Sequence, residues 1–284
     1  MKKIKLLIIF FILIITSGCL NDNSMDNISI ATSSYPIKYV VEYLYGNHST
    51  ITSIYPLDSN INEFVISDIS LEQYNKSDMF IFNGLTDESK YIKSMLKSNK
   101  NLKIIDVTSN MIVDYSNEEL WLDPSNLLTI ANNIKKGFAE YIQSTYLLNE
   151  IDQNYELLKN ELTKIDGKFY SVARSSNSST IIVSGKAFKF LEKYGIKVIN
   201  VDEDLKTEKD INEVNTLISE DKIRYIFTEY KEDINPNAQR FIDAGVENIE
   251  LYTMNNLKDV NLDQNNYISL MNQNLENLKK ELIK

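Results

Sequence analysis

The stretch LNEIDQNYELLKNELTKIDGKFYSV, residues 148–172, decides the fold. Its apolar residues recur at intervals of three and four, which is the spacing of one helix face. They are Ile151, Tyr155, Leu158, Leu162, Ile165 and Phe169. A helix of this length would extend for about 37 Å, which is long for a globular domain. The pattern therefore predicts a helix that runs between two lobes.

Short apolar runs alternate with amphipathic stretches on both sides of that helix. Before it we predict strands at residues 28–32, 50–55, 79–82 and 102–107, and helices at 37–45, 71–76 and 88–96. After it we predict strands at 180–183, 198–201, 224–227 and 249–252, and helices at 187–193, 209–218, 238–244 and 268–283. No strand is expected in residues 124–176. This alternation indicates parallel sheets with helices on both faces.

The predicted fold is α/β, with two lobes that are each a mostly parallel sheet flanked by helices and that are joined by one long backbone helix. The expected divisions are a lipoprotein signal peptide at 1–18, a tether at 19–27, an N-terminal lobe at 28–147, the linking helix at 148–176 and a C-terminal lobe at 177–284. Ligands of such sheets bind beyond the carboxyl ends of the strands, so the cleft between the lobes is the expected site.

The N-terminus has the three parts of a secretion signal. Lysines precede an apolar run from Leu6 to Ile15, and the small residues Thr16, Ser17 and Gly18 follow it. The run is too short to span a bilayer, which needs roughly 20 residues. Cys19, the only cysteine, comes next. This arrangement resembles a bacterial lipobox and predicts acylation at Cys19, although leucine is more usual than Thr16. An ordinary signal peptide with a chance cysteine is the alternative.

The composition limits the partners of the mature chain. Residues 19–284 carry 27 basic and 40 acidic side chains, a net charge near −13. An acidic surface argues against nucleic acid and against docking on anionic lipid by charge. Membrane attachment is therefore expected through lipid on Cys19.

Five motifs resemble a known family. Trp121-Leu122-Asp123-Pro124 before a long helix is similar to the central motif of the zinc- and manganese-binding lipoproteins of bacterial ABC importers. The other four, in chain order, are Ser33-Ser34-Tyr35-Pro36, Asp78 to Gly84, Ser184 to Phe188 with Tyr194-Gly195, and Tyr267 to Leu278. The resemblance implies two α/β lobes bridged by a rigid helix, one metal at their interface, and delivery of that metal to an ABC permease and its ATPase.

The metal ligands of the family are replaced in this chain. The family position before the first-lobe helix falls on Asn62, and the position ahead of the Trp-Leu-Asp-Pro motif falls on Glu119. The second-lobe position falls on Gly185, and the late acid falls on Thr253 or Met254. Among these, only Glu119 is a good metal ligand. The resemblance therefore implies a degenerate site for zinc or manganese, with no cofactor beyond that possible divalent cargo.

Two kinds of ligand remain open. Glu119 with Glu63, Glu118 or Glu229 could form an oxygen-rich site for a divalent ion, whereas the alternative is that these acids are solvated charges at the rim. Lys186 would instead suit an anionic organic ligand. The residues expected to line the cleft are Asn62, Glu63, Glu119, Ser184, Gly185, Lys186, Glu229, Thr253 and Met254.

The remaining chemistry does not indicate an enzyme. The single histidine, His48, is expected in a solvated loop and is not a predicted ligand. No serine triad, phosphate loop or dinucleotide fingerprint is recognisable. The sequence therefore predicts a lipid-anchored, extracytoplasmic solute-binding protein of a metal-type ABC importer. The alternative is a surface lipoprotein, adhesin-like or regulatory, that keeps the fold but not the metal.

Overall fold

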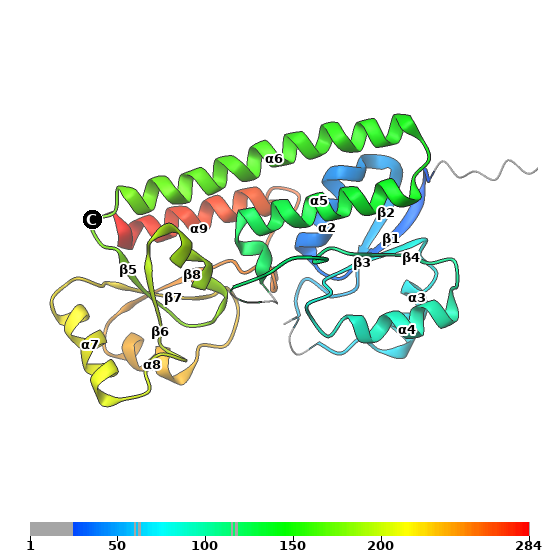
Figure 1. Ribbon diagram of the computed structural model, residues 1–284. Coiled ribbons are helices and arrows are strands. Elements are labelled where there is room, and N and C mark those ends of the chain that lie inside the picture. The colour runs from blue at the N-terminus through cyan, green and yellow to red at the C-terminus, as the bar shows by residue number, and fades with distance from the viewer. Residues whose placement is uncertain (1–24, 60, 62–63, 115, 117–118, 284) are drawn as a thin grey trace, which may run out of the picture.

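Two sheets lie side by side beneath a shared layer of helices in the computed structural model (Figure 1). The structure describes residues 25–59, 61, 64–114, 116 and 119–283. Cys19 lies outside this part of the chain. Within it, no helix is long and apolar enough to cross a membrane.

The first sheet contains four parallel strands in the order β2-β1-β3-β4. The strands are β1 (Ile28–Thr32), β2 (Ser49–Ser53), β3 (Met79–Phe82) and β4 (Lys103–Asp106). The helices that connect them are α2 (Tyr35–Tyr45), η1 (Gly46–His48), α3 (Asp68–Tyr74) and α4 (Ser89–Ser98). Proline in the first turn of α2 suits a helix start, because the missing N–H has no partner there.

The second sheet repeats the arrangement with the order β6-β5-β7-β8, again all parallel. Its strands are β5 (Thr180–Val183), β6 (Lys197–Asn200), β7 (Tyr225–Glu229) and β8 (Glu247–Leu251). The connections are η3 (Ala187–Tyr194), α7 (Glu208–Ser219) and α8 (Pro236–Asp243). The segment predicted as a helix after β5 is a 3₁₀ helix, which ends at Gly195 with φ +88°.

Three further helices join α2 in the layer above the sheets. They are α5 (Pro124–Tyr141), α6 (Thr145–Arg174) and α9 (Tyr267–Leu282). The short η2 (Leu120–Leu122) precedes α5, and Asp123 caps α5 by accepting a hydrogen bond from the Ser125 N–H at 2.8 Å. Helix α6 has 30 residues and passes over both lobes (Figure 1). It begins three residues before the predicted start, because the Ser144 hydroxyl caps it by accepting from the Leu147 N–H.

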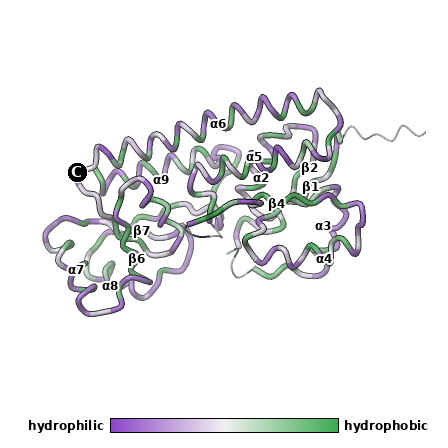
Figure 2. The backbone as a smooth tube through the Cα atoms, viewed as in Figure 1, coloured by the Kyte–Doolittle hydropathy of each residue, from purple (hydrophilic) through white to green (hydrophobic). Residues whose placement is uncertain are grey.

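The apolar core reflects this layering. One buried cluster lies between the helical layer and both sheets, and it includes Ile30 and Ile81 from the first lobe together with Ile181 and Phe227 from the second. Two smaller clusters lie on the opposite faces of the sheets, beneath α3 and α4 in one lobe and beneath α7 and α8 in the other. Figure 2 shows the hydrophobic strands at the centre of each lobe. The continuous upper core joins the lobes into one packed unit.

The joint between the lobes is centred on Trp121. Its indole Nε1 donates to the Thr253 carbonyl at 2.9 Å, and its carbonyl accepts from the Tyr267 hydroxyl at 2.6 Å. Beside it, Lys193 from η3 forms ion pairs with Asp123 and, at 2.9 Å, with Asp166 of α6. These buried contacts connect segments of both lobes, so they oppose large hinge motion.

The predicted α/β fold of two parallel sheets and one long helix is confirmed. Predicted and observed elements differ mainly at their ends. The environment of His48 differs from the solvated loop that the sequence predicted. Its Nδ1 lies 2.9 Å from Asp26 Oδ1 and its Nε2 lies 3.1 Å from Glu150 Oε2 in α6, and its side chain is only 23 % exposed. That expectation was wrong because the carboxylates of two distant segments converge on the imidazole.

Candidate functional site

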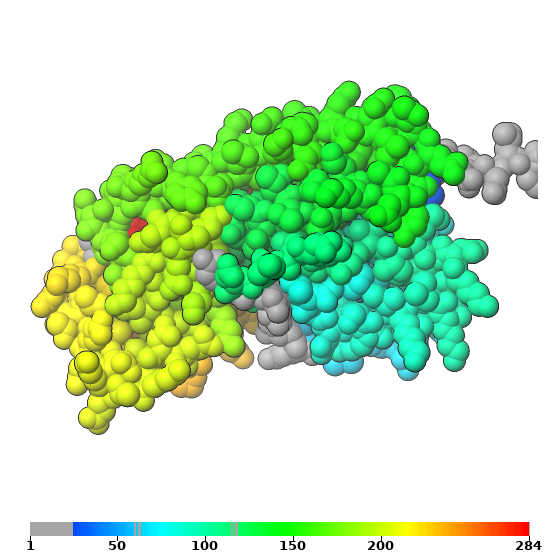
Figure 3. Space-filling model, viewed as in Figure 1, coloured from blue at the N-terminus to red at the C-terminus, as the bar shows by residue number. Residues whose placement is uncertain are grey.

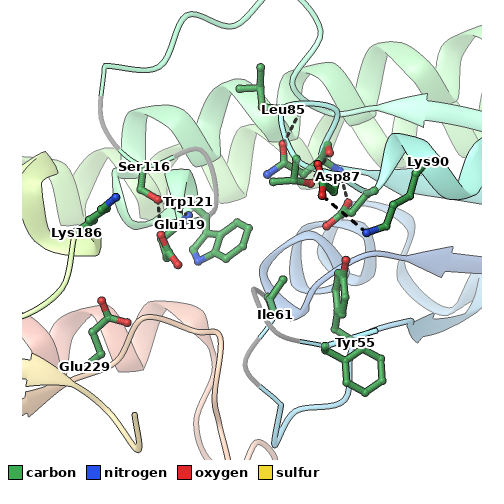
Figure 4. A pocket seen from close by; sticks show the side chains of 14 residues that line it. Tyr55, Ile61, Leu85, Asp87, Lys90, Ser116, Glu119, Trp121, Lys186 and Glu229 are labelled. Carbon is green, nitrogen blue, oxygen red and sulfur yellow. Dashed lines mark hydrogen bonds and ion pairs between the residues drawn. The ribbon is translucent and has the colours of Figure 1, made fainter. Parts of the chain in front are cut away.

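A pocket of about 560 Å³ opens between the lobes. Figure 3 shows the lower edge of the molecule indented there. The pocket is lined by side chains of both lobes, which include Tyr55, Phe64, Asn83, Thr86, Glu88, Ser116, Glu119, Trp121, Lys186 and Glu229 (Figure 4).

The parallel sheets place these side chains at the pocket. Asn83 directly follows β3, and Glu229 is the last residue of β7. The carboxyl ends of parallel strands in each sheet meet at one edge, where ligands of such folds bind. Glu119 is not positioned by a strand. It immediately precedes η2 at the joint between the lobes.

Glu119 is held in a defined position. Its exposed fraction is 7 %. Its Oε1 accepts from Asn255 Nδ2 at 2.8 Å, and its Oε2 accepts a short hydrogen bond from the Ser116 hydroxyl. Hydrogen bonds to a charged acceptor are stronger than neutral ones, so these two donors fix the carboxylate at the pocket wall.

Glu229 faces Glu119 across the pocket (Figure 4). Burial, together with the negative charges of Glu119, Glu232 and Asp202, raises the pKa of the Glu229 carboxyl to about 8. Its carboxyl occupies the space beside Gly185, where an added Cβ would lie 2.0 Å from Glu229 Oε1. Gly185 also has φ +107°, a conformation that side chains disfavour. The glycine therefore makes room for the Glu229 carboxyl.

The first-lobe side of the pocket contains a second buried carboxyl. Glu88 is 3 % exposed and accepts from the Asn83 N–H at 2.8 Å. Burial raises the pKa of Glu88 to about 7 despite that hydrogen bond. The rings of Tyr55 and Phe64, in edge-to-face contact at 5.9 Å, form the adjacent wall. The first-lobe half of the pocket therefore combines an aromatic wall with the charged side chains of Asp87, Glu88 and Lys90, whereas Glu119 and Glu229 lie in the other half.

A smaller hollow of about 280 Å³ lies behind Glu229 in the second lobe. Its lining includes Ser184, Gly185, Asp202 and Glu232. Asp202 Oδ2 accepts from the Ser184 hydroxyl at 2.9 Å and from the Gly185 N–H at 2.8 Å. Glu229 separates this hollow from the main pocket, so Ser184 and Gly185 lie behind the Glu229 carboxyl.

The other residues predicted to line the cleft have different positions. Lys186 reaches the rim of the pocket, but its ammonium pairs with Glu203 at 3.1 Å and its side chain is 71 % exposed. Thr253 and Met254 are buried, with exposed fractions of 0 % and 1 %, and Met254 has φ +69°.

Three of the predicted residues cannot be placed. Asn62, Glu63 and Glu118 lie outside the described residues.

Asn255 is a site residue that the sequence reasoning missed. It is 6 % exposed and contacts Glu119 directly. The signal available in the sequence was its place just after the last predicted strand, one residue beyond the position assigned to the late acid. Within the described ranges, no group of three or more His, Cys, Asp or Glu side chains is arranged to hold a metal ion. The candidate donors are the carboxyls of Glu119 and Glu229, which line the pocket, and the amide of Asn255, which bonds Glu119.

Comparison with known proteins identifies the class. Residues 30–281 match the family described as zinc-uptake complex component A, periplasmic (ZnuA). The chain belongs to this family, whose members are solute-binding proteins of metal ABC importers.

Individual relatives are distant and their names mention different metals. The iron-binding protein YfeA of Yersinia pestis is 21 % identical, over 96 % of this chain and 93 % of its own. A metal ABC transporter substrate-binding lipoprotein of Lactococcus lactis is 21 % identical, over 100 % of this chain and 99 % of its own. The Zn(II)-bound ZnuA-like domain of Streptococcus pneumoniae AdcA shares the fold, with a TM-score of 0.74 at 19 % identity, over 91 % of this chain and 100 % of that domain. The metal must therefore be argued from the residues of this chain.

Proposed function

We propose that this protein captures a divalent metal ion in the pocket between its lobes, with Glu119 and Glu229 as the facing carboxylates. The observation that carries the proposal is the position of Glu229. The family resemblance places a metal ligand at Gly185, and the Glu229 carboxyl fills the space that a side chain there would occupy. A ligand from the end of β7 thus replaces a ligand from the segment after β5.

Charge supports a cation as the cargo. Glu119 and Glu229 repel each other in a partly buried pocket, where charges interact more strongly than in water. A divalent ion between them would neutralise both charges. An anion would add to the repulsion, and the charge of Lys186 at the pocket rim is already paired with Glu203. The acidic lining therefore favours a cation over the anionic ligand considered from the sequence.

The surrounding structure supports a delivery role. The contacts of Trp121, which lines the pocket, and of Lys193 join the lobes, so the binding groups are largely preorganised. We infer that the protein is a carrier rather than an enzyme and that it presents the loaded pocket to an ABC permease with its ATPase. Acylation of Cys19 would hold it at the outer side of the cell membrane, close to the first lobe, in which Met25 is buried and Asp26 pairs with His48.

Metal titration of the purified full chain tests the proposal. The chain is stripped of metal with chelator, and Mn²⁺, Zn²⁺, Fe²⁺ and Mg²⁺ are titrated by calorimetry while the melting temperature is followed. We expect about one ion per chain. Glu119→Gln and Glu229→Gln should each weaken binding at least tenfold, since each removes one charged ligand. Glu208→Gln, on the exposed first turn of α7, is the matched control and should bind as the wild type does.

Two results would contradict the proposal. One is the absence of binding by all four ions. The other is a rise in melting temperature with small organic anions but not with metal ions, because ligands that bind only the native state stabilise it.

A further inference from the structure

We propose that Asn255 is the specificity-determining residue of this pocket. In this assignment it orients Glu119 and contributes a neutral amide oxygen, so that the pocket is an all-oxygen site for a hard divalent cation of the Mn²⁺ type. The inference depends on the proposed function, because it specifies which metal ions that pocket holds and how it distinguishes between them.

The backbone of the segment after β8 positions Asn255 beside Glu119. The Asn274 amide of α9 bonds both the N–H and the carbonyl of Tyr252, each at 2.8 Å. The next carbonyl, of Thr253, accepts from the Trp121 indole at 2.9 Å. Met254 then adopts φ +69°, a strained conformation for a residue other than glycine. Its cost is offset by the packing around it, and the turn brings the next side chain against Glu119.

Only one end of the Asn255 amide is used. Nδ2 donates to Glu119 Oε1 at 2.8 Å. Within the described part of the chain, Oδ1 is buried and has no hydrogen-bond partner. An unsatisfied buried polar group costs about 1–3 kcal/mol, so a purely structural residue here would be expected to satisfy both ends. A metal ion bound beside Glu119 would give this oxygen a partner.

The donor atoms favour a hard cation. The candidate ligands are the carboxylates of Glu119 and Glu229 and the amide oxygen of Asn255. Zinc sites in proteins use imidazole, thiolate and carboxylate, whereas carboxylate and carbonyl oxygens suit manganese, magnesium and calcium. A neutral amide in place of a third carboxylate also keeps the charge of these ligands at two, which matches a dication.

Selectivity rather than affinity alone is the informative measurement. Zn²⁺ binds most sites more tightly than Mn²⁺, so an all-oxygen site is recognised by a small ratio of the two affinities. We expect the full chain to bind both ions, with Zn²⁺ no more than about tenfold tighter. Asn255→Ala should weaken Mn²⁺ binding by about 10- to 100-fold, the usual effect of losing a supporting contact. Asn255→His, which adds an imidazole, should raise the Zn²⁺ to Mn²⁺ affinity ratio at least tenfold.

Two further variants guard against a merely structural effect. Asn256→Ala is the matched control, since the neighbouring side chain is half-buried and bonds backbone groups, donating to the Lys231 carbonyl at 3.3 Å and accepting from the Lys258 N–H at 3.1 Å. Asn255→Asp should melt lower than the wild type without metal, because it adds a charge beside Glu119, and should gain more in melting temperature when Mn²⁺ is added.

The outcomes separate the inference from the function. Tight Zn²⁺ binding with an affinity ratio above a hundred, or Mn²⁺ binding by Asn255→Ala equal to that of Asn256→Ala, would overturn the assignment of Asn255 and leave metal capture standing. Failure of the wild type to bind any divalent ion would overturn both.

Discussion

Replacing Gly185 with alanine tests whether the glycine exists to accommodate Glu229. The backbone at φ +107° disfavours any side chain, which costs about 1–2 kcal/mol. The new Cβ would also meet Glu229 Oε1 at 2.0 Å, so the carboxyl must move. Overpacking that forces a side chain to move costs about 1–3 kcal/mol, and Glu229 is only partly buried, so the lower end applies. We expect Gly185→Ala to lower the free energy of unfolding by about 3 kcal/mol in total.

The chain provides a matched control in Gly195. Its φ is +88°, but nothing lies within 4 Å of an added Cβ. Urea denaturation should therefore show a loss of only about 1–2 kcal/mol for Gly195→Ala. In a Glu229→Ala background, the loss in free energy of unfolding caused by Gly185→Ala should fall to that of Gly195→Ala, because the obstructing carboxyl is gone. The difference is a coupling free energy between residues 185 and 229, obtained from a double-mutant cycle.

A coupling free energy near zero would refute this reasoning. So would equal losses for Gly185→Ala and Gly195→Ala in the otherwise unchanged chain. Metal titration of the same variants adds a second criterion, since Gly185→Ala should weaken divalent-ion binding and Gly195→Ala should not.

Three further predictions concern charged groups away from the proposed ligands. Since the pKa of Glu88 is raised from 4.5 to about 7, the stability contributed by this group falls as the pH rises between those values. The unfolding free energy of wild type relative to Glu88→Gln should therefore decrease by up to about 3 kcal/mol between pH 4.5 and pH 8, and a pH-independent difference in urea denaturation would exclude this. The pKa of His48 is raised, most by its hydrogen bond to Asp26, so its contribution is present below pH 6.5 and lost as the pH rises above its folded-state pKa. The melting temperature should accordingly separate His48→Gln from wild type more at pH 5.5 than at pH 8.5, and the reverse order would contradict the bridge to Asp26. Lys193→Met should destabilise the chain by about 3 kcal/mol, because it leaves the Asp123 carboxylate partly buried without its cation; a loss below about 0.5 kcal/mol in urea would show that the pair is a surface contact.

The fold was predictable because its signals are local. The apolar positions of α6 follow one face for most of 30 residues, and strand β3 is the uninterrupted apolar run Met79–Phe82. The ends of elements were less predictable, since they depend on caps. The capping hydroxyl of Ser144 extends α6 to Thr145, and the segment from Ala187 tightens into a 3₁₀ helix.

The site was only partly predictable because its contacts are not local. Glu119 and Glu229 were expected at the cleft from their places before the Trp-Leu-Asp-Pro motif and after a strand. The contact between Asn255 and Glu119 joins residues 136 positions apart, and it depends on a positive φ at Met254 that no sequence pattern indicated. Lys186 was expected to contribute its charge to the pocket, whereas its pairing with Glu203 is a property of the folded surface.

The closing of the lobe joint by helix α9 has a consequence for how the chain folds. Tyr267 reaches Trp121 across 146 residues, and Trp121 reaches Thr253 across 132. Contacts of such sequence separation form slowly, because the intervening chain must be ordered before they contribute. The joint cannot form until nearly the whole chain is available. If the chain crosses a membrane from its N-terminus, its two lobes would therefore remain unjoined until α9 has crossed. Truncation before Tyr267 should therefore leave the joint without its hydrogen bond to the Trp121 carbonyl.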